Sequence, residues 1–407
     1  MTHLTDAGRA RLEDYLERVG EELGNVRRRA SFATYALGLL GDCERKSVEP
    51  IAARATGSEL EVDAVHQRLL HFLTDSGWDD HAVRLLAARY ALKAMTAHED
   101  VEAWILDDTG FLKQGTHSVG VQRQYTGSAG KVTNCQAGVS LSIATRGDHL
   151  PVDFELYLPV CWTENAARRR EARIPDDVVF RTKPEMGLGM VARALADGLP
   201  PGVVLADAGY GASSDFRLGL HRLGIHYSVG VNPLTSVYEV DQAVNRGGRA
   251  IGLRDLAAKL EAKGKFERCT WRAGTRGDLS ARFAMRRVTP RGERDRELEE
   301  RPPVWLLIEW RDGEDEPANY FFSSLPADIP LQELVRITMQ RWRTERAYED
   351  LKGELGLDHY EGRRFRGWHH HISVALACYA FVVAERHRIF PLPSRRPRPA
   401  RPHRSAA

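Results

Sequence analysis

Long apolar runs are missing from this sequence of 407 residues. No stretch approaches the roughly 20 consecutive apolar residues that a membrane-spanning helix needs, so we expect no membrane partner. The first 23 residues have the pattern of a charged amphipathic helix, without the apolar centre of a secretory signal peptide. We therefore expect a cytoplasmic protein.

Cysteine is scarce as well. The five cysteines are scattered along the chain, and no two of them form a CxxC pair; they are Cys43, Cys135, Cys161, Cys269 and Cys378. An odd, dispersed set argues against both a disulfide framework and a zinc site. Reduced and mostly buried thiols are the expectation.

The chain also lacks a strong excess of either charge, since its net charge is only +2. The distribution is less even. No acidic residue follows Glu385, whereas seven arginines and five prolines do. This composition predicts a basic, disordered tail over 391–407. Such a tail could attract phosphates in a salt-dependent way, or it could be solvated without a specific partner.

Four segments with different patterns of apolar residues precede the tail. Residues 1–97 show apolar spacing typical of helices and are expected to form a helical domain that either binds DNA or is a plain bundle, with DNA binding preferred. Residues 98–232 read as three strands followed by helix, strand, helix and strand. Residues 233–325 read as a β-rich insertion, and 326–390 as long helices. The fold class is therefore α/β, a mixed sheet flanked by helices.

Two aspartates follow apolar strand patterns in the α/β segment. Asp107 follows the apolar run Trp104–Leu106, and Asp207 follows Val203–Ala206 and precedes two glycines. Carboxylates at the ends of neighbouring buried strands can lie within reach of the same metal ions. A lone aspartate after a strand is more often a turn or helix-capping residue, so the inference depends on a third acid.

Glu345 is the candidate for that third acid. At 100° per residue, Arg341, Glu345, Tyr348 and Lys352 share one face of a helix. The two cations favour the ionised form of the glutamate and could hold DNA phosphates. A surface helix with i,i+4 ion pairs would show the same periodicity.

Three carboxylates suit phosphoryl transfer by two Mg²⁺ or Mn²⁺ ions. These hard cations prefer oxygen ligands and leave coordination positions for water and substrate phosphate. One ion activates the attacking oxygen, and the other stabilises the leaving oxygen.

The segment 117–136 combines cations, an aromatic residue and glycines. Arg123, Tyr125 and Lys131 are suited to contact a DNA backbone and bases. A hairpin with solvated polar side chains is the alternative.

Two further motifs invite other functions. His369, His370 and His371 point about 100° apart on a helix and cannot converge on one ion, so DNA contact or packing is expected. Residues 187–192 match GxGxxA, and Asp207 follows Gly187 by 20 residues, as in nicotinamide-binding enzymes. The tight strand-to-helix turn that this fingerprint requires is missing.

Longer motifs carry a family resemblance. The segment 106–141 resembles the first catalytic block of IS701-family transposases, within the IS4-like DDE group. Residues 156–162, 180–186 and 203–211 resemble the following blocks, and 341–381 resembles the C-terminal block.

The resemblance implies an RNase H-like core in which Asp107, Asp207 and Glu345 are the catalytic and metal-binding triad, with Asp108 as the alternative first acid. It also implies cleavage of DNA at terminal inverted repeats and strand transfer into target DNA, by a homodimer on paired ends, associated with the nucleoid. The family signature places a tyrosine where this chain has Thr338, so any role of that tyrosine is in doubt. A domesticated, non-mobile DNA-binding regulator is the alternative function.

Overall fold

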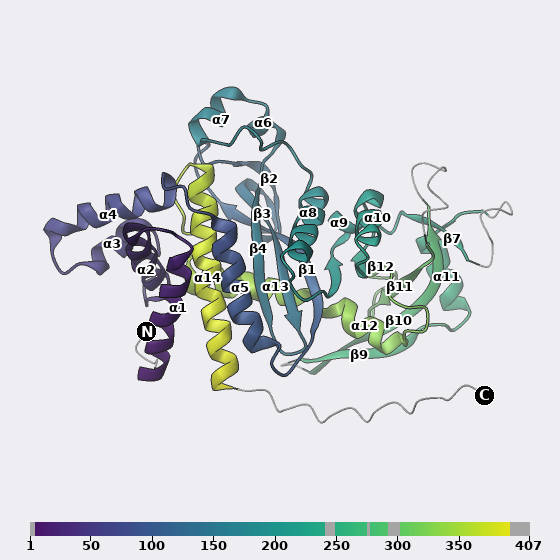
Figure 1. Cartoon of the computed structure of the whole chain (residues 1–407). Coiled ribbons are helices and arrows are strands. Elements are labelled where there is room, and N and C mark those ends of the chain that lie inside the picture. Colours follow the sequence, from purple (N-terminus) through teal and green to yellow (C-terminus); the bar gives the residue numbers. More distant parts are fainter. Residues whose placement is uncertain (1–4, 241–248, 275–276, 292–301, 391–407) are drawn as a thin grey trace.

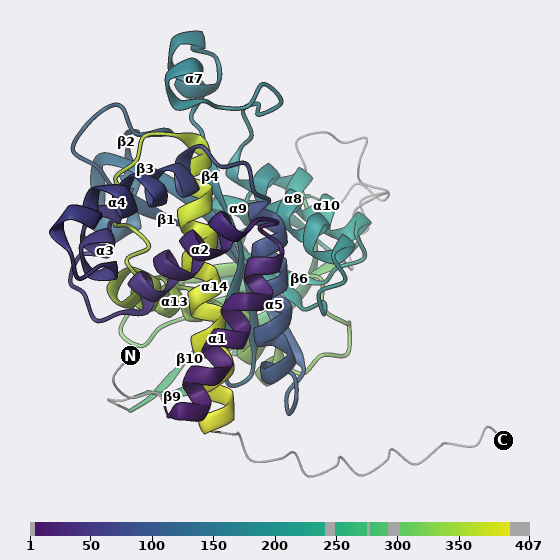
Figure 2. The same ribbon diagram turned by 60° about the vertical axis from the view of Figure 1, so that its left-hand side comes forward.

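The computed structural model describes residues 5–240, 249–274, 277–291 and 302–390. Helices from the two ends of the chain lie side by side at one end of the molecule, and a large sheet extends from them to the other end (Figures 1 and 2). None of the helices in the described ranges combines the length and the apolar character that a bilayer crossing requires.

The N-terminal segment is helical, as predicted. Thr5, Asn25 and Asp79 each cap the helix that follows by accepting a hydrogen bond from a backbone N–H of its first turn. The helices are α1 (Asp6–Glu21), α2 (Val26–Leu40), α3 (Val48–Ala55), α4 (Glu59–Thr74) and α5 (Asp80–Met95).

One mixed sheet contains the strands of the described residues, in the order β2-β3-β1-β5-β6-β12-β11-β10-β7-β8, with β4 beside β3 and β9 beside β10. The strands are β1 (Val101–Leu112), β2 (Gln122–Thr126), β3 (Lys131–Thr145), β4 (His149–Tyr157), β5 (Val203–Ala206), β6 (Tyr227–Gly230), β7 (Ser236–Glu239), β8 (Ile251–Gly252), β9 (Glu267–Gly274), β10 (Gly277–Pro290), β11 (Val304–Trp310) and β12 (Asn319–Ser323). The predicted mixed α/β class is confirmed.

The strands before residue 232 form the centre of the molecule. β1, β3 and β4 pair antiparallel, and β5 and β6 continue the sheet from β1 in parallel. Helix α8 (Lys183–Ala196) leads into β5, and α10 (Ser214–Arg222) leads into β6. The predicted succession of three strands, helix, strand, helix and strand is present, and the strand of this segment that the sequence analysis missed is the short β2.

The region 233–325 is rich in strands, as predicted, and it extends the same sheet. β12 pairs antiparallel with β6, and the other strands follow outward from it. Helix α11 (Leu253–Ala262), which was not predicted, packs in this region. Several short elements before residue 232 were also not predicted, among them the 3₁₀-turn η1 (Gly127–Ala129) and the helices α6 (Val160–Thr163) and α7 (Ala166–Ala172).

The C-terminal segment is helical, as predicted, but its first helical stretch is divided. Helix α12 (Leu331–Thr338) is followed by the 3₁₀-turn η4 (Met339–Arg341) and by α13 (Trp342–Leu355). The last described helix is α14 (Phe365–Ile389). The tail predicted over 391–407 lies outside the described residues.

Helix α14 joins the N-terminal helices to the sheet. Its side chains are buried along most of its length, and they share one apolar core with helices α1–α5 and with the central strands. Tyr15 on α1 donates a hydrogen bond to the Ala377 carbonyl at 2.7 Å. The N-terminal helices are thus packed as part of the main core.

The three consecutive histidines belong to this packing. Both ring nitrogens of His370 face backbone carbonyls, of Leu73 at 2.8 Å and of Trp78 at 3.2 Å. His371 contacts the Tyr35 hydroxyl at 2.9 Å. All three histidines, His369 included, are buried. Packing and DNA contact were the two roles predicted for these histidines, and the structure confirms packing.

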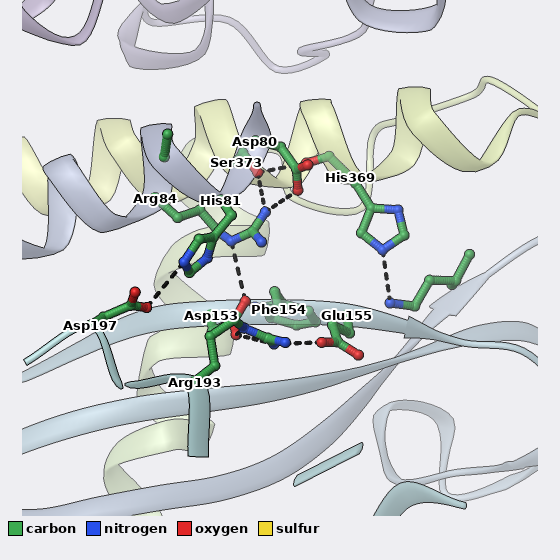
Figure 3. Close-up of polar contacts among 12 residues, drawn as sticks. Asp80, His81, Arg84, Asp153, Phe154, Glu155, Arg193, Asp197, His369 and Ser373 are labelled. Atoms are coloured by element: carbon green, nitrogen blue, oxygen red, sulfur yellow. Dashed lines mark hydrogen bonds and ion pairs between the residues drawn. The ribbon is translucent and has the colours of Figure 1, made fainter. Parts of the chain in front are cut away.

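A buried network of charges connects α5, β4, α8 and α14 (Figure 3). Arg84 forms an ion pair with Asp80, and its Nε lies 3.2 Å from Asp153 Oδ1. Arg193 contacts Asp153 and Glu155, each at 2.5 Å. Burial acts to raise the pKa of Asp80, but the adjacent Arg84 outweighs it and lowers the pKa to about 2.

Replacing Arg84 should destabilise the fold strongly. Arg84→Ala leaves the buried Asp153 and the part-buried Asp80 short of a cation, a loss that costs about 3–5 kcal/mol in the free energy of unfolding. Lys93→Ala, at an exposed position of the same helix α5, should change it by less than about 0.5 kcal/mol. Urea denaturation of both variants measures the difference; equal midpoints would show that the network contributes nothing.

The buried histidines predict a loss of stability in weak acid. Burial lowers the pKa of His149, His370 and His371 to about 4, from an ordinary value of 6.5. The unfolded chain therefore binds more protons below pH 6.5, and stability falls as the pH drops from about 6.5 toward 4. The buried Asp107, whose pKa is raised, acts in the opposite direction, but it is one group against three. Urea midpoints that stay constant between pH 7.5 and 5 would contradict this.

Candidate active site

The register between two parallel strands brings two of the predicted acids together. β1 and β5 pair with Ile105 opposite Leu205. Continuing that register by two residues sets Asp107 level with Asp207, which matches their separation of 100 positions in the sequence. The sequence predicted that the first strand ends at Asp107, but β1 continues along β3 to Leu112. β5 ends at Ala206. The end of the shorter strand leaves space in front of both carboxylates.

Asp207 has a local structural role in addition to its place in the cavity. It is the N-cap of the short helix α9 (Ala208–Gly211), and its Oδ1 accepts a hydrogen bond from Gly209 N at 2.8 Å. Gly211 has no room for a side chain, because a Cβ atom there would lie 2.0 Å from the Gly230 carbonyl oxygen. The glycines after Asp207 therefore allow the chain to turn tightly against β6.

Asp107 is buried, with 8% of its surface exposed. Its Oδ1 accepts from Asp108 N, and its Oδ2 accepts from Arg341 Nη1, both at 2.8 Å. Burial raises the pKa of Asp107 to about 7, even though Arg341 acts to lower it.

The neighbouring Asp108 is paired differently. Its Oδ2 accepts from Lys183 Nζ at 2.7 Å, and Lys183 lies in the first turn of α8. Asp107 thus faces the helix that carries Glu345, through Arg341, whereas Asp108 faces α8. This difference favours Asp107 over Asp108 as the partner of Glu345.

Four residues of the C-terminal segment face the same cavity, as the helical periodicity predicts. Arg341, Glu345, Tyr348 and Lys352 all line it. Arg341 Nη2 lies 3.3 Å from Glu345 Oε1, so one guanidinium bridges Asp107 and Glu345. The Glu345 side chain is 61% exposed. The i,i+4 ion pair that the sequence analysis gave as the alternative is therefore present between Arg341 and Glu345. Both residues also line the cavity that contains the two aspartates.

The cavity has a volume of about 760 Å³ and contains all three predicted carboxylates, Asp107, Asp207 and Glu345. Tyr125, two-thirds exposed on β2, also lines it. Arg123 and Lys131, predicted to contact DNA, are exposed on the same hairpin but do not line this cavity.

Lys352 is held by the protein. Its Nζ donates to the Gly110 carbonyl and Thr109 Oγ1 at 2.8 Å, and to Ser128 Oγ at 3.2 Å. Burial lowers its pKa. The lysine therefore ties α13 to β1 and η1.

Sequence reasoning missed several residues that line the cavity, among them Lys183, Ser128 and Tyr210. Tyr210 follows Asp207 by three positions, which was the available signal. Its hydroxyl is buried without a hydrogen-bond partner in the described part of the chain. A buried unpaired hydroxyl costs about 1–3 kcal/mol, so this atom is available to a group that enters the site.

The donor set suits a hard divalent cation, since carboxylate oxygens of Asp107, Asp108, Asp207 and Glu345 surround one cavity. Within the described ranges, however, no group of three or more His, Cys, Asp or Glu side chains is gathered closely enough to hold a metal ion. Arg341 provides the positive charge between two of the acids. Loading the site would require this arginine and the exposed Glu345 to change rotamer.

Two other sequence features have structural explanations. Thr338, at the position of the family tyrosine, is buried and hydrogen-bonded to Ser228 at 2.7 Å, where it joins α12 to β6. Gly187 lies inside helix α8, and a Cβ there would contact Leu106 and Tyr210. Gly187 thus gives room for packing, and because Gly187 and Gly189 both lie inside α8, they do not form a phosphate-binding turn.

Comparison with known protein families assigns the chain to a family of enzymes. The chain belongs to the DDE superfamily endonucleases, whose family model matches residues 18–278. A second family model, the transposase DDE domain, matches residues 188–381.

Among individual proteins, the chain is similar to the probable transposase for insertion sequence element IS701 of Microchaete diplosiphon. The two are 29% identical over 221 residues, which cover 54% of this chain and 53% of the relative. The match therefore spans about half the length of that curated relative. The resemblance to the IS701 family and to DDE transposases is confirmed.

Removing the Lys352 ammonium should affect stability first. Lys352→Met leaves Thr109, Ser128 and the Gly110 carbonyl without their shared donor, and we expect a loss of about 1–3 kcal/mol in the free energy of unfolding. The matched control, Lys131→Met at the exposed start of β3, should leave stability within about 0.5 kcal/mol. If Lys352→Met weakened only DNA binding and left the urea midpoint unchanged, the anchoring role would be wrong.

Proposed function

We propose that this protein is a DDE transposase that cleaves DNA at the terminal inverted repeats of its element and joins the cut strand to target DNA. The observation that carries the proposal is the meeting of Asp107, Asp207 and Glu345, from three distant segments, around one open cavity. An active site for phosphoryl transfer needs this set of hard oxygen ligands beside space for a phosphodiester.

The catalytic core in this proposal is RNase H-like. The strand order β4-β3-β1-β5-β6, antiparallel on one side of β1 and parallel on the other, supports this assignment. Residues 98–232 and 326–390 would form the core and 233–325 the insertion. The helical segment 1–97 would contribute DNA contacts.

Asp107, Asp207 and Glu345 would hold two Mg²⁺ or Mn²⁺ ions, which supply activation of the attacking oxygen and stabilisation of the leaving oxygen. The chain's own residues position the DNA. Arg341, once released from Asp107, presents a planar guanidinium suited to bidentate contact with a phosphate. Lys352 keeps α13 against β1 and adds positive charge to the cavity wall.

The exposed hairpin of β2 and β3 would contact the DNA next to the cleaved bond. Arg123 and Lys131 provide charges for the backbone, and Tyr125 provides a ring on which a base can stack. Because the element has two ends, we infer a homodimer that acts on paired ends, in the cytoplasm at the nucleoid.

The proposal is tested by a cleavage assay with purified full chain, Mg²⁺ or Mn²⁺, and DNA that carries the repeats flanking the gene. Asp107→Asn, Asp207→Asn and Glu345→Gln should each lower the cleavage rate by roughly a thousandfold or more while leaving DNA binding largely intact. Glu349→Gln is the matched control, because Glu349 lies one turn further along α13 and lines the same cavity. It should retain activity.

Three results would count against the assignment. Full activity of Glu345→Gln would remove Glu345 from the triad. Loss of activity in Asp108→Asn but not in Asp107→Asn would make Asp108 the first acid. Specific DNA binding by the wild type without cleavage in either metal would fit a domesticated regulator instead.

A further inference from the structure

A second groove lies near the candidate active site, at the start of β2, whereas the carboxylate cavity lies at the end of this strand. It has a volume of about 640 Å³ and is lined by residues of β2, β3, α6 and α7, among them Gln122, Arg123, Asn134, Cys161 and Arg168. We name it the α6–α7 groove. The helices α6 and α7 project beyond the end of the sheet where β2 lies (Figures 1 and 2).

Strand β2 connects this groove to the carboxylate cavity. Side chains two residues apart point to the same face of a strand, and Arg123 and Tyr125 are both exposed. Arg123 lines the α6–α7 groove, whereas Tyr125 lines the carboxylate cavity. Two residues of a strand span roughly 7 Å, close to two base steps along a DNA strand. The exposed face of β2 therefore forms a short path between the two hollows.

The α6–α7 projection is fixed beside β2 by Trp162. The indole is buried and donates to the Val121 carbonyl at 2.8 Å, one residue before β2. The guanidinium of Arg168 lies 4.9 Å from the centre of the same ring. This cation–π contact holds the Arg168 guanidinium over the Trp162 ring, at the wall of the groove.

The two arginines of the groove carry positive charge that no acid neutralises directly. Among the residues that the structure describes, no ion pair is found for Arg123 or Arg168, and the acid in the groove lining is Glu164. Two arginines from separate elements, β2 and α7, together with amide side chains in the same lining, match the phosphates of a nucleic acid backbone.

We propose that the α6–α7 groove binds the DNA strand that flanks the scissile phosphodiester, after that strand has crossed β2. This inference rests on the proposed function and deepens it, because it assigns the path of the substrate beyond the catalytic cavity. Arg123 and Arg168 contact successive phosphates, and the contacts position the strand without reading its sequence.

The exposed thiol of Cys161 provides a direct test. Cys161 lies in the groove, and of the chain's five cysteines it is the one with an exposed side chain. DNA bearing a mixed-disulfide tether at single positions on either side of the cleavage point is added to full-length Asp207→Asn protein. The Cys161 thiolate then displaces the small thiol of the tether and forms a protein–DNA disulfide.

Crosslinking should be confined to tethers a few nucleotides to one side of the scissile bond and should disappear in Cys161→Ser. Arg168→Ala should weaken DNA binding and lower the slope of log K against log salt by about one unit, as expected for one lost phosphate contact. Arg170→Ala, on the same helix but outside the groove lining, should leave the slope unchanged.

The failure of this inference and that of the proposed function are distinguishable. If the protein binds the DNA but Cys161 forms no crosslink at any position, or forms it equally at all positions, the groove is not on the path of the strand. If crosslinking is confined as expected but the wild type does not cleave, the groove assignment stands and the catalytic proposal fails.

Discussion

The parallel register of β1 and β5 is the constraint on which the site depends. Both strands are apolar and buried, so a shift by one residue would turn an aspartate into the core and core side chains into the cavity. Pairing Ile105 with Leu205 leaves Asp107 and Asp207 level at the point where β5 ends. Since β3 supports β1 beyond this point, Asp107 can be buried in a continuing strand and still face a cavity.

Charge balance around the cavity follows from that placement. A buried carboxylate is costly unless a cation is near, and Arg341 provides one to Asp107 while Lys183 provides one to Asp108. The pKa of Asp107 is nevertheless raised to about 7, so a further positive charge would bind favourably there. Arg341 also contacts Glu345, so one guanidinium lies between the buried Asp107 and the exposed Glu345.

Much of the fold follows from local patterns in the sequence, whereas the choice of the candidate triad also depended on the resemblance to the IS701 family. The apolar strands before Asp107 and Asp207 are short, continuous and bounded by turns, which makes them easy to recognise. The common face of Arg341, Glu345 and Lys352 follows from helical periodicity, and the 3₁₀-turn ends at Arg341 without disturbing it.

What escaped prediction depends on contacts between distant segments. Lys183 and Tyr210 enter the cavity only because α8 and α9 pack across the sheet. Helices α6 and α7 have four and seven residues, so they are too short to show the apolar periodicity that identifies longer helices. The position of the N-terminal helices in the main core, through α14, likewise has no signature in local sequence.

The central claim is that three carboxylates form one metal-binding active site, and anomalous X-ray scattering from crystals soaked in Mn²⁺ tests it most directly. The account predicts manganese peaks in the carboxylate cavity, within about 2.0–2.6 Å of oxygens of Asp107, Asp207 and Glu345, with Arg341 turned away from Asp107. Manganese bound elsewhere, or an empty cavity with the Arg341–Asp107 ion pair retained at saturating Mn²⁺, would contradict it.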